Sequence, residues 1–203
     1  PAYHLDFETM SPAVPLYVGT SPYQAIPFQW SVHHIVKDGS SKHFEYLADG
    51  QTDPRRELAE TLISALGQSS EPILMYTGYE RTVIKGLISA VPGLKKPLLK
   101  IIDRLMDLKA VVSGYYYNAD FMGSYSLKSV GPALADELSY DDLDDVADGM
   151  AAANTFAAIV SGLISDPIEI ARLRKALLVY CKQDTWATVE VQKALIAKCR
   201  RSE

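Results

Sequence analysis

The hydrophobic pattern of this chain changes from a two-residue period to a helical period, which limits the folds that it can adopt. Residues 3–7 (Tyr-His-Leu-Asp-Phe) alternate between apolar and polar side chains and predict a strand with one buried face. Residues 26–36 and 42–47 are rich in β-branched and aromatic side chains and flank Asp38-Gly39, so we expect a hairpin that extends the sheet. The first quarter of the chain is therefore predicted to form a β-sheet.

Helical patterns dominate after the hairpin. Asp53 and Pro54 suit the N-cap and the first position of a helix that Gly67 closes, and the apolar strand 72–76 leads into a helix over 79–90. We expect an extended piece over 107–112, an acidic linker over 141–148, and further helices over 96–105, from Ser124 or Ser126 to about Leu138, over 150–164 and over 167–198. This order predicts an α/β fold: a mixed β-sheet flanked by helices, with a helical C-terminal half.

Size and composition favour one folded domain. The chain has 203 residues, of which 48% are hydrophobic and 22% charged, and this is enough to bury a substantial core. It contains no uninterrupted run of 18 apolar residues and does not begin with a secretion signal, so we expect neither export nor a membrane span. Two cysteines are too few for a disulfide framework, and we expect thiols in a reducing cytoplasm. Because an apparent strand begins within three residues and without an initiator Met, we also expect flanking domains in the same polypeptide.

The net charge limits how the chain could bind a nucleic acid. Lys and Arg total 20 against 25 Asp and Glu, a net charge of −5, which argues against a broad basic surface. Two bound divalent cations would add four positive charges at the point where a phosphate must lie, leaving a net charge of about −1. The charge therefore does not exclude a metal-dependent enzyme that acts on nucleic acids.

Asp6 and Glu8 are the first candidate site residues. Their two-residue spacing directs both carboxylates to the same face of one strand, where they could bind a divalent cation from a rigid support. Acids on the solvent face of an edge strand would have the same spacing. The motif therefore needs a partner elsewhere in the chain.

Tyr180 and Asp184 form the second candidate pair. A separation of four residues in a helical pattern places the Tyr hydroxyl and the Asp carboxylate on one helix face, where both could address one metal-bound water. A surface Asp beside a half-buried Tyr is the alternative interpretation.

Together these segments resemble a known superfamily. Asp6-Phe7-Glu8-Thr9 is similar to the first motif of the DEDD 3′→5′ exonucleases, and Tyr180-x-x-x-Asp184 is similar to the third motif of their tyrosine subtype, DEDDy. The histidine subtype has a His shortly before the last Asp, whereas all four histidines here lie in the first quarter of the chain. The resemblance implies a single ribonuclease H-like domain over residues 1–203.

The second motif departs from the superfamily pattern. It usually contains Asn and, after an aromatic residue, Asp, whereas this chain has Met75-Tyr76-Thr77-Gly78-Tyr79-Glu80. Glu80 takes the Asp position, and Asp107 is a possible substitute ligand. Glu80, the segment Gly123–Lys128 and the Tyr-Cys-x-Gln-Asp ending resemble, more narrowly, an uncharacterised bacterial domain family with this nuclease core. That likeness extends from residue 3 to about residue 196.

The resemblance implies a chemistry. The expected cofactors are two Mg²⁺ or Mn²⁺ ions, bound through oxygen by four carboxylates: Asp6, Glu8, Glu80 and Asp184. Tyr180 would orient the attacking water.

Several other side chains are expected to contact the substrate. Thr9 and Tyr79 lie inside the matching motifs, and Lys128 follows the Gly-Ser segment. Lys95, Lys96 and Lys100 could also contact phosphates, although surface lysines are usually only solvated. Tyr115–Tyr117 and Tyr125 could stack on unpaired bases or pack within the protein.

Three functions remain open at this point. The first is a metal-dependent 3′→5′ exonuclease that acts on DNA or RNA, single-stranded or with an accessible 3′ end. The second is a catalytically inactive nuclease-like module that binds nucleic acid or assembles a larger protein. The third is a metal-dependent endonuclease.

Overall fold

The computed structural model describes residues 1–135, 138, 146 and 148–200, and its centre is a five-stranded sheet in the order β3-β2-β1-β4-β5. The strands are β1 (Ala2–Met10), β2 (Ile26–Ile35), β3 (Ser41–Leu47), β4 (Ile73–Met75) and β5 (Leu105–Asp107). β1, β2 and β3 are antiparallel neighbours, whereas β4 is parallel to both β1 and β5. The predicted hairpin is confirmed, and β1 is the central strand of a mixed sheet.

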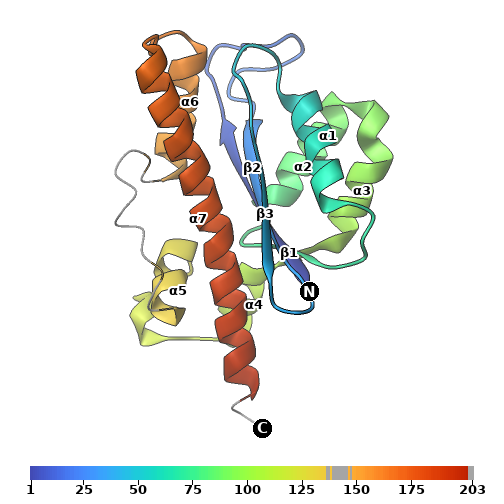
Figure 1. Cartoon of the computed structure of the whole chain (residues 1–203), viewed down its shortest axis with the longest axis vertical. Coiled ribbons are helices and arrows are strands. Elements are labelled where there is room, and N and C mark those ends of the chain that lie inside the picture. Colours follow the sequence, from blue (N-terminus) through green and yellow to red (C-terminus); the bar gives the residue numbers. More distant parts are fainter. Residues whose placement is uncertain (136–137, 139–145, 147, 201–203) are drawn as a thin grey trace.

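Helices cover both faces of the sheet (Figure 1). They are α1 (Arg55–Leu66), α2 (Tyr79–Ala90), α3 (Lys95–Arg104), α4 (Leu108–Tyr115), α5 (Leu127–Leu134), α6 (Gly149–Val160) and α7 (Pro167–Arg200), with 3₁₀ turns η1 (Pro92–Leu94) and η2 (Ala119–Phe121). Helices α1, α2 and α3 lie together on one side, and the long α7 crosses the other side with α5 and α6 beside it. The predicted mixed α/β architecture with a helical C-terminal half is confirmed.

The face of the sheet that meets α1, α2 and α3 is apolar. Leu5 and Phe7 point from β1 into a cluster with Leu58 and Leu62 of α1 and Ile84 of α2. Side chains alternate along a strand while apolar residues of a helix recur every three or four positions, so the two patterns read from the sequence meet here. This cluster is the main hydrophobic core.

The opposite face of the same strands is polar. In the antiparallel register of β1 and β2, His4 lies opposite His33, Asp6 opposite Ser31, and Glu8 opposite Gln29. Of these six residues all but Asp6 are buried, and the Asp6 carboxyl itself is enclosed. The interpretation of Asp6 and Glu8 as acids on the solvent face of an edge strand is therefore wrong, because β1 is central and α7 covers this side.

Hydrogen bonds to α7 satisfy much of this polar face. His4 Nδ1 lies 3.0 Å from Thr188 Oγ1, and Ser31 Oγ lies 2.8 Å from Thr185 Oγ1. The Gln29 amide donates to the Leu177 carbonyl oxygen at 2.8 Å. Burying polar groups is tolerated where each finds a partner, so this part of α7 docks through polar contacts.

The structure corrects several predicted element boundaries, and the helix expected over 150–164 ends at Val160. The extended piece expected over 107–112 is wrong: β5 ends at Asp107, whose carboxylate accepts a hydrogen bond from the Ala110 N–H and thereby caps α4. The helix capped by Ser126 ends at Leu134 rather than at about Leu138. Helix α1 begins at Arg55, one residue late, although Asp53 still accepts a hydrogen bond from the Arg55 N–H. Most of the acidic linker over 141–148 lies outside the described residues.

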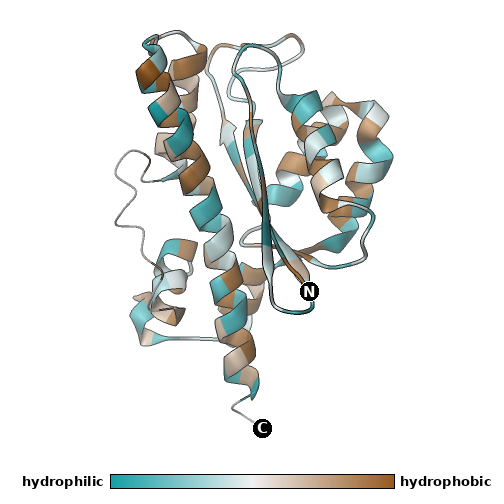
Figure 2. Cartoon of the chain, viewed as in Figure 1, coloured by the Kyte–Doolittle hydropathy of each residue, from teal (hydrophilic) through white to brown (hydrophobic). Residues whose placement is uncertain are grey.

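Hydrophilic and hydrophobic residues are interleaved along α7 (Figure 2). Over the described part of the chain, no helix combines the length and the apolar character that a membrane span requires.

Candidate functional site

Four predicted acids converge where β1, α2 and α7 meet. Asp6 and Glu8 project from the polar face of β1, Glu80 lies in the first turn of α2, and Asp184 projects from α7. The charges of Glu8, Asp184 and Glu80 all act on Asp6. Glu8 and Glu80 are 6% and 3% exposed, so the centre is enclosed. Residues separated by up to 178 positions therefore form one site.

The chain between β4 and α2 places Glu80. The strand ends at Met75, and the Thr77 hydroxyl lies 3.4 Å from Glu80 Oε2 while also accepting a hydrogen bond from the Tyr79 N–H. The carboxylate also benefits from the free N–H groups at the helix start. A strand, a short turn and a helix thus direct this acid toward β1.

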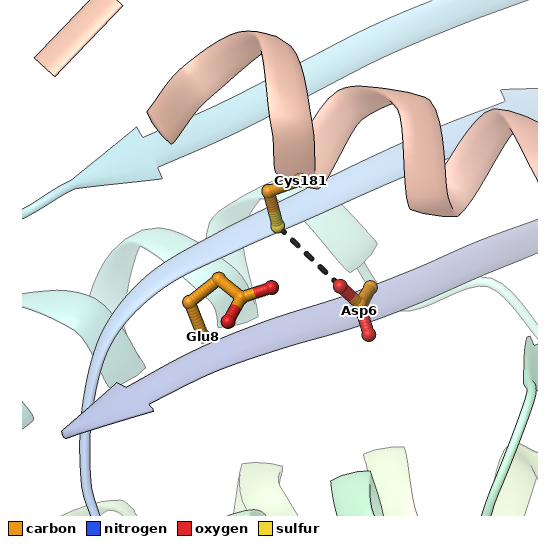
Figure 3. A group of neighbouring side chains, drawn as sticks. All are labelled: Asp6, Glu8 and Cys181. Carbon is orange, nitrogen blue, oxygen red and sulfur yellow. Dashed lines mark hydrogen bonds between the residues drawn. The ribbon is translucent and has the colours of Figure 1, made fainter. Parts of the chain in front are cut away.

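Helix α7 contributes Tyr180, Cys181 and Asp184. Tyr180 and Asp184 are one helical turn apart on α7, as their spacing predicts, and burial followed by the Asp184 charge raises the pKa of the Tyr180 phenol. The Cys181 thiol points down from α7 and donates to Asp6 Oδ2 at 3.6 Å, as Figure 3 shows. Tyr180 is 3% exposed and Cys181 is fully buried. Sequence reasoning identified the first and the last of these residues but not Cys181.

Burial and mutual repulsion make these carboxyls weak acids. Burial first, and then the charges of neighbouring carboxylates, raise the pKa of Asp6 well above its usual range. The same two causes raise the pKa of Glu8 to about 8, against a smaller opposing effect of Lys128. Burial also raises the pKa of Glu80 to about 7. The charge of Glu80 is in turn one of the causes that raise the pKa of Asp6, so ionisation of Glu80 opposes that of Asp6.

Three of the site residues have the spacing of potential cation ligands. One ligand atom each from Asp6, Glu8 and Cys181 lies within 4.8 Å of the other two. Carboxylate oxygen and thiolate sulfur are both common metal donors in proteins. The Glu8 carboxylate accepts no hydrogen bond from any residue in the described part of the chain. This donor set could therefore bind a divalent ion.

The predicted substrate-contacting residues fall into two groups. Lys128 of α5 lies at the site: its Nζ is 5.4 Å from the centroid of the Tyr180 ring. The hydroxyls of Thr9 and Tyr79 are 2.5 Å apart, and Tyr79 is 43% exposed at the rim. The other lysines considered, Lys95, Lys96 and Lys100, lie on α3, on the opposite side of the sheet from α7 and away from the acids.

Asp107, the possible substitute for Glu80, has a structural role in α4. Its carboxylate caps α4, as described above, although its charge contributes to the raised pKa of Glu80.

The predicted aromatic residues fall into a packed group and an exposed group. Tyr116 and Tyr125 pack against a buried cluster around Phe121, whereas Tyr115 and Tyr117 are exposed.

A cavity of about 390 Å³ lies between the end of β1 and α6 and was not predicted. Thr9 and Met10 line it from β1, and Gly149, Ala153 and Ala157 line it from α6. A Cβ atom on Gly149 would lie 3.5 Å from Glu8 Oε2, so the first turn of α6 touches the acid cluster. The four-residue spacing of small side chains on α6 is the sequence signal that could have revealed this trough.

Comparison with known proteins identifies one family. A family model described as a domain of unknown function, DUF2779, matches residues 3–126. The match includes Asp6, Glu8 and Glu80 and ends before Lys128 and the residues of α7. No curated protein and no solved structure matches the chain. Because the matched segment covers more than half of its length, the chain belongs to the DUF2779 family, a domain of unknown function.

Proposed function

We propose that this protein is a metal-dependent nuclease of the ribonuclease H-like class that removes nucleotides from the 3′ end of a nucleic acid. The observation that carries the proposal is the convergence of Asp6, Glu8, Glu80 and Asp184 in one enclosed centre. The resemblance to the DEDD superfamily rests on the same four positions. The mixed sheet flanked by helices is the architecture that this resemblance implies.

The energetics of the acid cluster favour a functional role. Buried carboxylates that repel one another destabilise a fold unless they are protonated or a cation neutralises them. Strongly raised pKa values caused by burial and like charges are typical of functional sites. A purely structural centre would be more stable with apolar or amide side chains at these positions.

The donor set suits divalent cations. Asp6, Glu8 and Asp184 are the proposed ligands of one ion, and Asp6 and Glu80 those of a second. When bound, two such ions supply the positive charge that activates a water and stabilises the leaving oxygen of a phosphodiester. Lys128 adds a positive charge on the same side of the site, where it can contact a phosphate.

Tyr180 is proposed to orient the attacking water. Burial and the adjacent carboxylates raise the pKa of its phenol, so the phenol keeps its proton at neutral pH. It can therefore donate a hydrogen bond but cannot act as a general base. Asp184, one helical turn away on α7, places a carboxylate near this hydroxyl.

The cavity beside Glu8 supports an end-processing reaction. It is large enough to accept part of one nucleotide and opens next to Thr9, whose hydroxyl is joined to Tyr79. A nucleoside placed there would have its phosphate near the acids. An unpaired end enters such a trough most easily, so a single-stranded 3′ end is the proposed substrate.

The decisive experiment measures the shortening of a 5′-labelled single-stranded oligonucleotide with Mg²⁺ or Mn²⁺. The wild-type protein is expected to shorten the strand stepwise, and chelation of the metal should stop the reaction. Asp6→Ala combined with Asp184→Ala should lower the rate by about 10³-fold or more. The matched control replaces two exposed acids on the far helices, Glu60→Ala with Asp103→Ala, and should keep the full rate. Equal rates for the two double variants would rule the proposal out.

A circular single strand separates the endonuclease from the exonuclease. Cleavage of the circle at a rate comparable with that of the linear strand would favour internal cutting. Calorimetry distinguishes the nuclease from the inactive binding module. If the protein is an inactive module, titration with millimolar Mg²⁺ or Mn²⁺ should produce no heat of binding that depends on Asp6.

A further inference from the structure

A buried thiol lies among the carboxylates of the proposed active site. Cys181 is fully buried, and its sulfur lies 3.6 Å from Asp6 Oδ2, pointing toward the space between Asp6 and Glu8 (Figure 3). A cysteine that serves only as a small core residue would have apolar neighbours on all sides. The sulfur of Cys181 instead faces two acids, Asp6 and Glu8.

The distances within this group are those of a shared cation. In a tetrahedral site with a metal–sulfur bond of about 2.3 Å and a metal–oxygen bond of about 2.1 Å, the sulfur and the oxygen lie about 3.6 Å apart. The observed separation between Cys181 Sγ and Asp6 Oδ2 is 3.6 Å, and one oxygen of Glu8 lies within 4.8 Å of both atoms. All three side chains could thus bind one ion with only small rotations.

A second observation points to a ligand at the same place. The Glu8 carboxylate is directed into this space and is 6% exposed, yet no residue in the described ranges donates a hydrogen bond to it. Elsewhere on this face of the sheet, His4 and Ser31 have hydrogen-bond partners on α7. A buried carboxylate without a donor is costly, and a cation would compensate it.

We propose that Cys181 is a direct ligand of the metal at the Asp6–Glu8 position and makes the site prefer thiophilic divalent ions such as Zn²⁺ over Mg²⁺. Sulfur is a soft donor that binds Zn²⁺, Co²⁺ and Cd²⁺ strongly, whereas Mg²⁺ requires oxygen ligands. On binding, the thiol transfers its proton to solvent and the thiolate forms the bond to the ion. The inference rests on the proposed function, since it concerns the metal of that site.

Cadmium alone is the appropriate probe because a cadmium–thiolate bond has an ultraviolet charge-transfer band that carboxylates cannot produce. Cd²⁺ titrated into the full chain should produce this band and saturate it at one ion per chain. Cys181→Ser should abolish the band and weaken Cd²⁺ binding about tenfold or more, with Mg²⁺ binding changed less than about twofold. Cys199→Ser, at the exposed second cysteine, is the matched control and should keep the band.

Glu8→Gln provides a second variant in case Cys181→Ser does not fold. It should weaken Cd²⁺ binding about tenfold while the band for each bound ion remains, because the thiolate is intact. No band in the wild type, or a band that disappears with Cys199, would overturn the inference. Equal losses of Cd²⁺ and Mg²⁺ affinity in Cys181→Ser would also overturn it, because the thiol would then only position Asp6.

The outcomes separate this inference from the proposed nuclease activity. A Cys181-dependent band in a protein that hydrolyses no nucleic acid would support the metal ligand and remove the nuclease. Shortening of the oligonucleotide with Mg²⁺, without a cadmium–thiolate band, would support the nuclease and overturn the proposed Cys181 ligand.

Discussion

The two faces of the central sheet bury side chains of opposite character. On one face Leu5 and Phe7 of β1 pack against the apolar stripes of α1, α2 and α3. On the other face His4, Asp6 and Glu8 of the same strand lie beneath α7. The first face stabilises the fold by removing apolar surface from water, whereas the second removes polar groups from water and must satisfy each of them.

The polar face itself has two parts. Around His4 the polar groups have partners on α7, including Thr188 and Gln192. Around Asp6 and Glu8 the neighbours are other acids, and the pKa values are raised. The contrast indicates that the first part is structural, whereas the second part costs stability. Such local instability is common at functional sites.

Leu5 and Asp6 are adjacent residues on opposite faces of the sheet. Substitutions at these two positions should change the stability of the protein in opposite directions. Leu5→Ala is expected to lower the free energy of unfolding by about 2–5 kcal/mol, because it leaves a cavity in the apolar core. Asp6→Asn should raise the stability of the metal-free protein at neutral pH, because folding no longer has to bury a carboxyl that is ionised in the unfolded chain. Chemical denaturation in the presence of a chelator measures both changes. A loss of stability in Asp6→Asn comparable with that in Leu5→Ala would mean that both faces are structural.

The acid cluster should also make stability depend on pH. Because the folded-state pKa values of Glu8 and Glu80 are raised to about 8 and about 7, their contribution to stability is complete below their unfolded pKa of about 4.5. It is lost as the pH rises through 7 to 8, so the metal-free protein should become less stable by a few kcal/mol between pH 5 and about pH 8.5. Thermal unfolding at several pH values with a chelator measures this loss.

Glu8→Gln is the control for this pH dependence. The variant should show a smaller decline, because it has one fewer group to ionise in the folded protein, and saturating metal should reduce the decline in the wild type. A pH profile identical in the wild type and the variant would show that Glu8 does not cause the decline.

These two faces also differ in how far the sequence could predict them. The apolar face follows from local patterns: alternation in residues 3–7 and the helical stripe of Leu58 and Leu62 each identify their buried side. The polar face does not, because an Asp and a Glu two positions apart look the same on an exposed strand. The two acids are buried because β1 lies at the centre of the sheet, and that position is set by contacts between residues far apart in the sequence.

For the site, the order of the motifs predicts that Tyr180 and Asp184 lie near Asp6 and Glu8, and the structure has these side chains close enough for their charges to interact. Cys181 was missed because a lone cysteine beside a tyrosine carries no spacing signal of its own. The wrong boundary after Asp107 has a local cause. Asp107 is both the last residue of β5 and the N-cap of α4, so the helix begins immediately after the strand. The apolar residues that follow are compatible with either a strand or a helix.

Thr188→Val tests the part of the polar face around His4, where the polar groups have hydrogen-bond partners on α7. The substitution preserves the shape of the side chain but removes the hydroxyl that lies 3.0 Å from His4 Nδ1 and donates to the Thr185 carbonyl oxygen. Leaving these buried groups without a partner should cost about 1–3 kcal/mol of unfolding free energy. Nuclease activity at a permissive temperature should be unchanged, because Thr188 lies one turn beyond Asp184. A stability within about 0.5 kcal/mol of the wild type would show that the network adds little.

The smallest expected effect concerns the trough between the acid cluster and α6. Ala153 lines the cavity beside Thr9, and Ala153→Leu would fill part of it without touching the carboxylates. If the terminal nucleoside lies there, the variant should raise the KM for a single-stranded oligonucleotide about tenfold, or about 1.4 kcal/mol, and leave kcat within about twofold. Ala110→Leu, on the exposed side of α4, is the matched control for adding the same bulk to a helix. Steady-state kinetics of both variants decide the matter: an unchanged KM in Ala153→Leu would mean that the strand leaves the acids by another route, and a lower kcat alone would mean that α6 acts through the position of Glu8.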